Sequence, residues 1–419
     1  MAGIPELGAS VDFVNGPAFI SFAFTLGDPI KGKLGTGQLA NADDSVDISS
    51  IILRSSIRRG RNRILNKFEA GTAVVEIKDD TGDWNPANTA GPYYGKLVPL
   101  RKIRIWADYE GARYYLFSGF ITSYDTTFAI GADGVSRVIL NCVDGFRLLN
   151  NAAISTVPDT GAGQLSGTRI NKLLDVVDWP TSQRDINAGD STMQADPGTA
   201  DRTVLEAIQT VENSEFGGFF LDAEGNATFY SRTTVSQYAD STPVAFSDDG
   251  TGIGYAQIDL AFDDTLIVND VSVQRLNGTN QTVTNQTSID DYFIHSGART
   301  GILVQTDEEA RDQATMILQS RKDATLRIDS MTLNLVDDGQ VARNIAGIDL
   351  EIFDLVTVTK QMPGSTSITS ELFVQGLQHD ITRTTFTTKI LTSEPIIQAF
   401  ILDSESQGIL GVEGVLSYY

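Results

Sequence analysis

Apolar residues along much of the chain alternate with polar ones in short runs, the pattern of half-buried β-strands. KIRIWADY (102–109) and SRVILNCVD (136–144) are two such runs. DYEGAR (108–113) and IGADGVS (130–136) border them, and their Gly and Asp residues accept the positive φ of hairpin turns. The pattern predicts a first β-domain over residues 46–150.

Few segments show the spacing of a helix. GTRINKLLDVVDWP (167–180) and TADRTVLEAIQTVENSEFGG (199–218) do so, and a hairpin, FFLDAEGNATFYSR (219–232), follows directly. We predict a small helix–hairpin α+β module over residues 151–240. A further helix near 306–322 has acidic residues in its first turn and basic residues at its end, which suits the helix dipole.

One internal similarity suggests a duplication. Residues 100–145 and 353–395 both run strand, loop, strand, glycine, strand, loop, strand. Gly119 and Gly376 hold the same place in the two stretches. Self-similarity across an inserted module suggests two copies of one β-fold, so we predict a second β-domain over residues 241–400 with that one further helix inside it. The predicted fold class is therefore mainly β with a small α+β module.

The two ends of the chain are weakly periodic. Residues 1–45 are Gly-rich and are interpreted as an N-terminal arm that folds against a neighbour, or as a strand plus loops, and residues 401–419 as a C-terminal tail. The apolar run PAFISFAF (17–24) is roughly half of what a bilayer span needs. No basic segment precedes it, so we expect neither a membrane span nor a cleaved leader.

Charge and cysteine content narrow the function classes. The 419 residues include 54 acidic and 31 basic side chains, a formal charge of −23. That balance argues against a nucleic-acid groove, which needs a basic face, and against docking on an anionic membrane. The single cysteine, Cys142, can form neither an intrachain disulfide nor a thiolate zinc cluster, and it is interpreted as a buried strand residue.

The segment GTAVVEIKDDTGDWNP (71–86) holds a dense carboxylate group, Asp79, Asp80 and Asp83. Clustered oxygen donors suit Ca²⁺, although the spacing of an EF-hand is missing, and paired carboxylates serve glycosidases. The simpler interpretation is an Asx-type turn after a strand. In that turn Trp84 would pack against the domain and Pro86 would stiffen the exit.

The one basic cluster comprises Arg58, Arg59, Arg61, Arg63 and Lys67. It has three interpretations: a solvated loop before a strand, a contact with an acidic surface of a neighbouring subunit, or a nucleic-acid contact. No interleaved aromatic residues support the stacking of single-stranded bases. We therefore retain these five residues as candidates for a subunit contact.

Two other features of the sequence suggest catalysis, but neither matches a complete catalytic motif. GDPIKGKL (27–34) nearly spells a phosphate loop, but Leu34 stands where Ser or Thr is needed. His295 and His379 are the only histidines, and neither lies in a nucleophile-elbow motif. We expect no catalytic residue, no metal and no cofactor.

The segments ILRSSIRRGRNRILNKFEAGTAVVEIKDDTGDWNP (52–86) and LVPLRKIRIWADYEGARYYLFSGFITSYD (97–125) resemble the opening domain of minor tail proteins of long-tailed bacteriophages. The resemblance is to the tail-tip or baseplate hub family, with the siphovirus phages as the expected group. RINKLLDVVDWP (169–180) and TVLEAIQTVENSEFGGFFLDAEGNATFYSR (203–232) are similar to the helix–hairpin module of these proteins. The likeness covers residues 50–235 best.

The resemblance implies two tube-like β-barrel domains per chain and a homotrimer whose ring is pseudo-sixfold. It implies a virion protein of the tail tip, made in the host cytoplasm, that caps or continues the tail tube. The implied neighbours are a distal tail ring protein, the tape-measure protein and tip or fibre proteins. Phage DNA would pass through without specific binding, and the negative charge suits such a channel. The motifs carry no catalytic residue.

Two rival functions belong to other classes. A tail module that binds host cell-wall glycan would present exposed aromatic residues on a groove, with Trp84, Tyr93, Tyr94, Trp106 and Tyr109 as candidates. A peptidoglycan hydrolase would depend on the three clustered aspartates.

Overall fold

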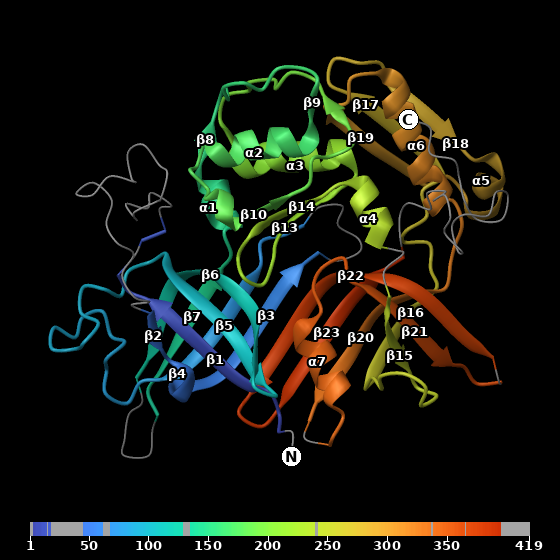
Figure 1. The fold of residues 1–419 in the computed structure, drawn as a ribbon. Helices are drawn as coiled ribbons and strands as arrows, with labels where there is room; N and C mark the ends of the chain where they lie inside the picture. Colours follow the sequence, from blue (N-terminus) through green and yellow to red (C-terminus); the bar gives the residue numbers. More distant parts are fainter. Residues whose placement is uncertain are drawn as a thin grey trace.

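A large β-sheet forms one side of the molecule, and two smaller assemblies lie against one end of its strands (Figure 1). The computed structural model describes residues 3–14, 16–17, 45–61, 68–128, 135–238, 242–336, 338–364 and 366–394. The predicted tail over residues 401–419 and most of the predicted arm lie outside these ranges. The large sheet has thirteen strands. They are β1 (Glu6–Asp12), β2 (Ser45–Asp47), β3 (Ile52–Gly60), β4 (Thr72–Lys78), β5 (Arg101–Tyr109), β6 (Ala112–Thr127), β7 (Arg137–Val143), β15 (Val244–Ser247), β16 (Gln257–Ala261), β20 (Arg327–Leu335), β21 (Leu355–Gln361), β22 (Ser367–Thr382) and β23 (Phe386–Ser393).

The order of strands in this sheet occurs twice. The first β-unit has the order β3-β4-β7-β6-β5-β1, and the second β-unit has the order β16-β20-β23-β22-β21-β15. β2 and a short 3-10 turn (Ser49–Ile51) precede β3. The units differ at one end, where β1 pairs antiparallel with β5 and β15 pairs parallel with β21. The strand order is therefore that of two similar halves.

The two β-units are joined edge to edge, because β3 pairs antiparallel with β22. The thirteen described strands of the two β-units form one open sheet and close no barrel, which corrects the expectation of two separate β-barrels. An edge strand presents unpaired N–H and C=O groups, and the long β22 extends past β21 far enough to satisfy those of β3. Each half thus continues the sheet of the other.

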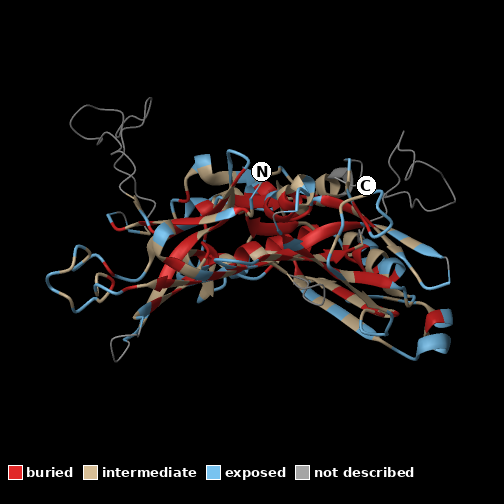
Figure 2. Cartoon of the chain, turned by 90° about the horizontal axis from the view of Figure 1, so that it is seen from below, coloured by how far each residue is buried: buried red, intermediate tan, exposed pale blue. Residues whose placement is uncertain are grey.

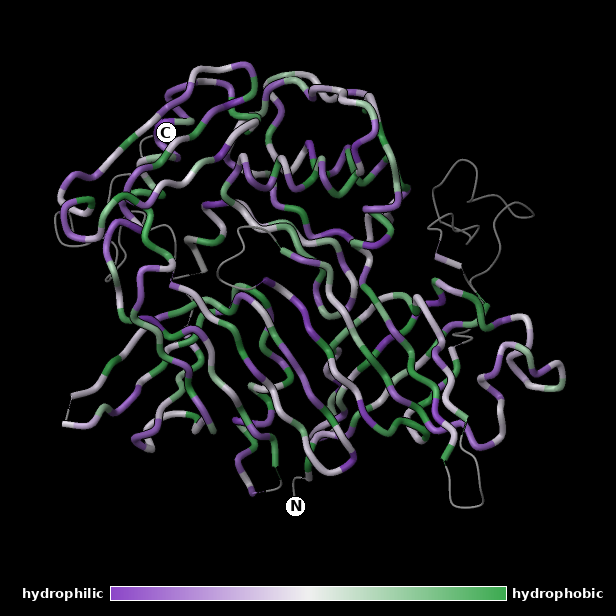
Figure 3. The backbone as a smooth tube through the Cα atoms, turned by 180° about the vertical axis from the view of Figure 1, so that it is seen from behind, coloured by the Kyte–Doolittle hydropathy of each residue, from purple (hydrophilic) through white to green (hydrophobic). Residues whose placement is uncertain are grey.

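Period-2 alternation places one face of each strand in the core. In β4, Ala73, Val75 and Ile77 are buried while the residues between them are more exposed. The same alternation is visible along the strands in Figure 3. Cys142 of β7 is buried in this core, as expected from the sequence, and burial raises the pKa of its thiol. Figure 2 shows the buried residues running through the middle of the molecule, with exposed residues at the outer loops.

The helices and the hairpin predicted within residues 151–240 are present, and they pack around an apolar core that also includes Phe68, Leu303, Ile352 and Phe353 from outside this range. A capping box of Thr203 and Glu206 starts its longest helix, and Phe216 ends that helix with φ of 60°. Its elements are α1 (Phe146–Asn151), β8 (Ala153–Ile154), β9 (Gln164–Leu165), α2 (Ser166–Asp175), a 3-10 turn (Thr181–Gln183), β10 (Arg184–Ile186), β11 (Thr192–Met193), β12 (Arg202–Thr203), α3 (Val204–Glu215), β13 (Gly218–Leu221), β14 (Ala227–Tyr230) and α4 (Arg232–Tyr238).

A second small assembly interrupts the second β-unit between β16 and β20. Its sheet has the order β18-β17-β19, and its core is separate from the other two. The predicted helix near 306–322 lies here as α6, started by a capping box of Thr306 and Glu309. The elements are β17 (Asp270–Arg275), β18 (Gln281–Thr284), α5 (Gln286–Tyr292), β19 (Ser296–Ile302) and α6 (Asp307–Arg321). The expectation of one helix in residues 241–400 is wrong, because this range also contains α5 and α7 (Val341–Asp349). Both are short, so the spacing of their apolar residues gives little helical signal.

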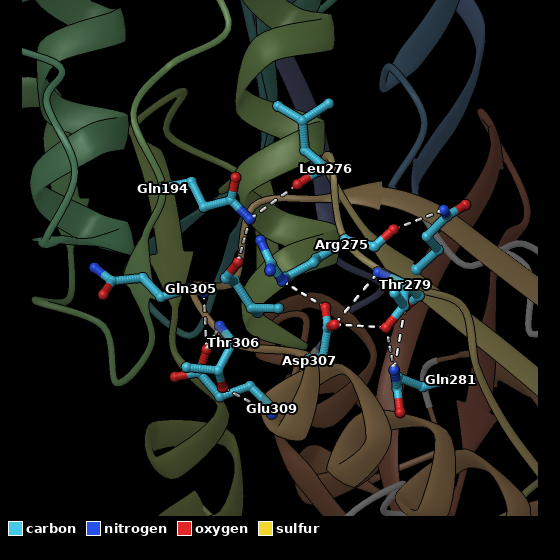
Figure 4. Close-up of polar contacts among 12 residues, drawn as sticks. Gln194, Arg275, Leu276, Thr279, Gln281, Gln305, Thr306, Asp307 and Glu309 are labelled. Carbon is cyan, nitrogen blue, oxygen red and sulfur yellow. Dashed lines mark hydrogen bonds and ion pairs between the residues drawn. The ribbon is translucent and has the colours of Figure 1, made fainter.

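Polar contacts attach this small sheet to the helix–hairpin module (Figure 4). The side-chain amide of Gln194 donates to the carbonyl oxygens of Val304 (2.6 Å) and Leu276 (3.2 Å). Next to this contact, Arg275 Nε donates to Asp307 Oδ1 (2.6 Å) at the start of α6. The two small assemblies are thus held together on one side of the large sheet.

Candidate functional site: the junction of the two β-units

The junction of β3 with β22 is the place where the basic cluster meets the second β-unit. The register runs from Gly60 opposite Gly376 to Arg54 opposite Thr382. Gly60 has φ of +92°, and a Cβ atom there would lie 2.3 Å from the carbonyl oxygen of Gln375. Only glycine fits both the conformation and the space at this point.

An ion pair between a buried arginine and a half-buried glutamate crosses the junction. Arg59 Nη1 donates to both carboxylate oxygens of Glu351, at 2.8 and 2.9 Å, and Arg59 is only 4% exposed. Glu351 Oε2 also accepts from the backbone N–H of Ala223 (3.0 Å), which belongs to the helix–hairpin module. One carboxylate therefore binds the first β-unit, the second β-unit and the module together.

The next arginine continues the contact. The backbone N–H of Arg61 donates to the carbonyl oxygen of Gln375 (2.8 Å), and its Nε donates to the side-chain oxygen of the same residue (2.7 Å). Its guanidinium lies 4.5 Å from the ring centre of Phe68, and burial lowers its pKa to about 10. Arg61 is thus fixed within the chain by both its backbone and its side chain.

A buried carboxyl group, that of Asp144, lies next to the junction. Burial raises the pKa of Asp144 to about 7, although the backbone N–H groups of Gly71 (2.6 Å) and Phe146 (3.0 Å) donate to it. A cavity of about 320 Å³ opens beside the ion pair of Arg59 with Glu351, and its lining also includes Asp222.

The five contact candidates are therefore spread over different environments. Arg58 makes a half-exposed ion pair with Glu69 (3.3 Å), whereas Arg59 and Arg61 bind residues of the second β-unit. Arg63 and Lys67 lie outside the described residues. Sequence reasoning did not find Glu351 or Gln375. No local signal points to them, because each lies about 300 residues away from its arginine in the sequence, with separations of 292 and 314.

The aspartate loop is a set of turns. Asp79 is buried and accepts from the backbone N–H of Trp84 (3.2 Å), and burial raises its pKa. Asp80 pairs with Lys78 (2.5 Å), and Asp83 accepts from the hydroxyl of Thr81 (2.6 Å). The three carboxylates have separate partners, and no metal-holding group of His, Cys, Asp and Glu occurs among the described residues.

Pro86 lies at the second position of a turn in which the N–H of Asn88 donates to the carbonyl of Asn85 (3.0 Å). Pro is favoured there because its φ is already set. Trp84 is buried against Phe13 and Tyr93, with ring centres 5.5 and 5.4 Å away. Pro86 thus lies within a turn, and Trp84 packs into the core next to it.

Gly119 and Gly376 lie in the corresponding strands β6 and β22, but not at corresponding positions. Each strand has a β-bulge opposite its partner, at Thr122 in β6 and at Gln375 in β22. Gly119 precedes its bulge by three residues, whereas Gly376 follows its bulge directly. The two stretches therefore match strand for strand, with the glycines shifted. A Cβ atom at Gly119 would lie 2.5 Å from the carbonyl oxygen of Val143, which explains that glycine separately.

The aromatic residues proposed for a glycan groove are mostly packed. Trp84, Trp106 and Tyr109 are buried, and the ring of Tyr93 stacks on Phe13 at 4.6 Å. Only Tyr94 is exposed, at 52%. A groove lined by these five side chains is therefore absent from this part of the structure.

The two histidines lie apart from any arrangement for hydrolysis. His379 is buried with its Nδ1 3.1 Å from the hydroxyl of Thr388, and burial lowers its pKa to about 3. The hydroxyl of Ser296 donates to Asp270 (2.7 Å) rather than to the neighbouring His295. No helix in the described ranges is long and apolar enough to span a membrane.

Comparison with known proteins shows the fold. No model of a protein family matches the chain, and no curated protein matches its sequence. The tail protein from Neisseria meningitidis MC58 is similar in structure, with a TM-score of 0.55 and 14% identity over 93% of this chain and 97% of that one. The 43 kDa tail protein of prophage MuSo2 from Shewanella oneidensis gives a TM-score of 0.55 and 13% identity, with the same coverage of 93% and 97%. The chain therefore has the fold of phage tail proteins.

Proposed function

We propose that this chain is a structural component of a phage tail, a trimeric hub at the tail tip or baseplate. The fold shared with two tail proteins over almost their whole length supports this proposal. The resemblance of residues 52–86 and 97–125 to the hub family of long-tailed phages points the same way. The observation that carries the proposal furthest is the edge-to-edge junction of two similar β-units in one chain.

The junction explains how a trimer would meet a sixfold tube. Cyclic assemblies close through repeated contacts between unlike surfaces. The contact of β3 with β22 is one such contact, made within the chain. Three chains that repeat it between molecules would place their β-units around a roughly sixfold, tube-like ring.

The other expected roles follow from that ring. Its lumen would form the passage for DNA during ejection, and a charge of −23 would repel phosphate rather than bind it. One face would receive a distal tail ring protein and the tape-measure protein, and the other would anchor tip or fibre proteins. The role is non-enzymatic and needs no metal or cofactor.

The first test is the mass of the purified chain in solution. Sedimentation velocity over a hundredfold range of concentration should show a species of three times the 45.3 kDa chain mass. A dimer, a hexamer, or a monomer at every concentration would contradict the trimeric hub.

A further inference from the structure

Strand β6 has an edge without a partner strand among the described residues. β5 pairs with β6 only as far as Ile121, and β7 occupies the other side of residues 123–127. In the second β-unit, β21 likewise pairs with β22 only as far as Phe373. There the next stretch, from Gly376 to Thr382, is the part that β3 joins. The end of β6 is the equivalent surface, and no strand of the described ranges pairs with it.

Strand β16 has the complementary open edge. It pairs with β20 on one side, and no described strand lies on the other. Strand β16 occupies the same place in the second β-unit as β3 does in the first. The first unit runs β3-β4-β7 at this end, and the second runs β16-β20-β23. One chain thus carries a second copy of each side of its own junction, and no described strand pairs with either copy.

We propose that β16 of one chain pairs antiparallel with residues 124–128 of a second copy, as β3 pairs with β22 within the chain. This interface rests on the trimeric hub proposed above and names the surfaces that would close the ring. If three chains repeat this contact around a ring, each chain uses its β16 edge once and its β6 edge once.

The internal junction also gives the register. The bulges at Thr122 and Gln375 align Ser123 with Gly376, and hence Tyr124 with Leu377. In β3, Ile57 faces the core and pairs with the buried Ala73. In β16, Leu260 faces the core and pairs with the buried Ile328. We therefore align Ile57 with Leu260. The residue pairs expected between copies are Tyr124 with Phe262, Asp125 with Ala261, Thr126 with Leu260, Thr127 with Asp259, and Phe128 with Ile258.

The side chains suit this register. Phe262 is 69% exposed and Phe128 is 56% exposed, and they lie at the ends of the two open edges. In the proposed pairing Phe262 meets the ring of Tyr124, and Phe128 meets Ile258. Cross-strand aromatic and β-branched pairs of this kind stabilise antiparallel sheets. The apolar residues share one face, and the polar residues Asp125 and Thr127 share the other.

Strand β16 also lacks the usual protection of a free edge. Isolated edge strands commonly carry Lys or Pro, which prevents pairing with other chains. β16 reads QIDLA, and its one charge, Asp259, is already neutralised by Lys389 (3.0 Å) and bound by the hydroxyl of Ser330 (2.6 Å). An edge of this composition is suited to a partner strand.

A disulfide tests the register. The variant with both Asp125→Cys and Ala261→Cys should form covalent dimers and trimers under mild oxidation, because directly opposed residues lie within disulfide reach. Each single variant serves as a control, since it still contains the buried Cys142. The matched negative control is Asp125→Cys with Gln257→Cys, which in this register would be about 13 Å apart along the strand.

The outcomes separate this interface from the hub itself. At least tenfold more covalent trimer from the first double variant than from the controls would support the pairing. A chain that is trimeric in solution but gives no more crosslink than the controls would overturn this interface and leave the hub standing. A chain that is not trimeric, by sedimentation of the unmodified protein, would overturn both.

Discussion

Gly60 and Gly376 face each other where the two β-units join, and their backbones approach too closely for side chains. A Cβ atom on Gly60 would lie 2.5 Å from the Cα atom of Gly376 and 2.3 Å from the oxygen of Gln375. This contact ends the pairing of β3 with β22 and turns the chain toward Arg61, whose backbone then donates to Gln375. The junction between the β-units therefore depends on two small residues more than 300 positions apart.

Gly60→Ala should destabilise the chain strongly. The substitution combines a left-handed backbone conformation with steric overlap, and we expect it to lower the free energy of unfolding by about 2–4 kcal/mol. Gly95→Ala is the matched control, because Gly95 also has positive φ (73°) but has open space around its Cβ position. Denaturant unfolding should show a loss of only about 1 kcal/mol for that control. Equal losses in the two variants would contradict the close approach.

Breaking the ion pair across the junction should cost more than breaking a surface pair. Glu351→Gln leaves the buried guanidinium of Arg59 without its charge partner, and we expect a loss of about 3 kcal/mol in unfolding free energy. Arg58→Ala removes the half-exposed pair with Glu69 and should cost about 0–1 kcal/mol. The prediction fails if Glu351→Gln is as mild as Arg58→Ala.

The buried carboxyl of Asp144 should make the chain less stable as pH rises. Its pKa in the folded chain, about 7, lies above that of an unfolded Asp, so folding favours the protonated form. The stabilisation is full at pH below about 4 and is lost as pH rises to about 7. Unfolding free energies measured between pH 5 and 8 should therefore fall less steeply for Asp144→Asn than for the unmodified chain. Parallel curves for the two proteins would contradict the assignment.

Phe262→Asp and Phe128→Asp should each weaken the trimer without unfolding the chain. Both side chains are exposed in the single chain, and both would be buried in the proposed pairing. We expect at least a tenfold rise in the concentration at which half of the chains assemble. Phe293→Asp is the control, because Phe293 is even more exposed (77%) but follows α5 and belongs to neither of the two edge strands. Sedimentation velocity would measure all three, and a similar effect in the control would contradict the interface.

Local signals in the sequence were sufficient for local structure. The acidic residues Asp307 to Glu309 predicted the first turn of α6, the glycines after Tyr109 and Asp222 predicted hairpins, and Asn85-Pro86 predicted a turn, because each signal acts within a few residues. The repeat of strand pattern likewise corresponds to the repeated strand order.

Long-range pairing could not be predicted in the same way. The basic cluster stood out, but its partners Glu351 and Gln375 come close to it only through the pairing of β3 with β22, strands that lie about 300 residues apart. The apolar pattern defines which face of a strand is buried, but not which edge it joins, and so the two expected barrels became one open sheet. The glycine match between Gly119 and Gly376 failed at residue level because each strand bulges at a different distance from its glycine.

Electron microscopy of the purified chain tests the central claim most directly. Class averages should show a ring with threefold symmetry, a central pore and six similar lobes. Around the ring, the contacts between neighbouring lobes should alternate between the junction within one chain and the junction between two chains. A ring of six identical chains, or a threefold particle without a pore, would contradict the account in which one chain supplies two of the six positions.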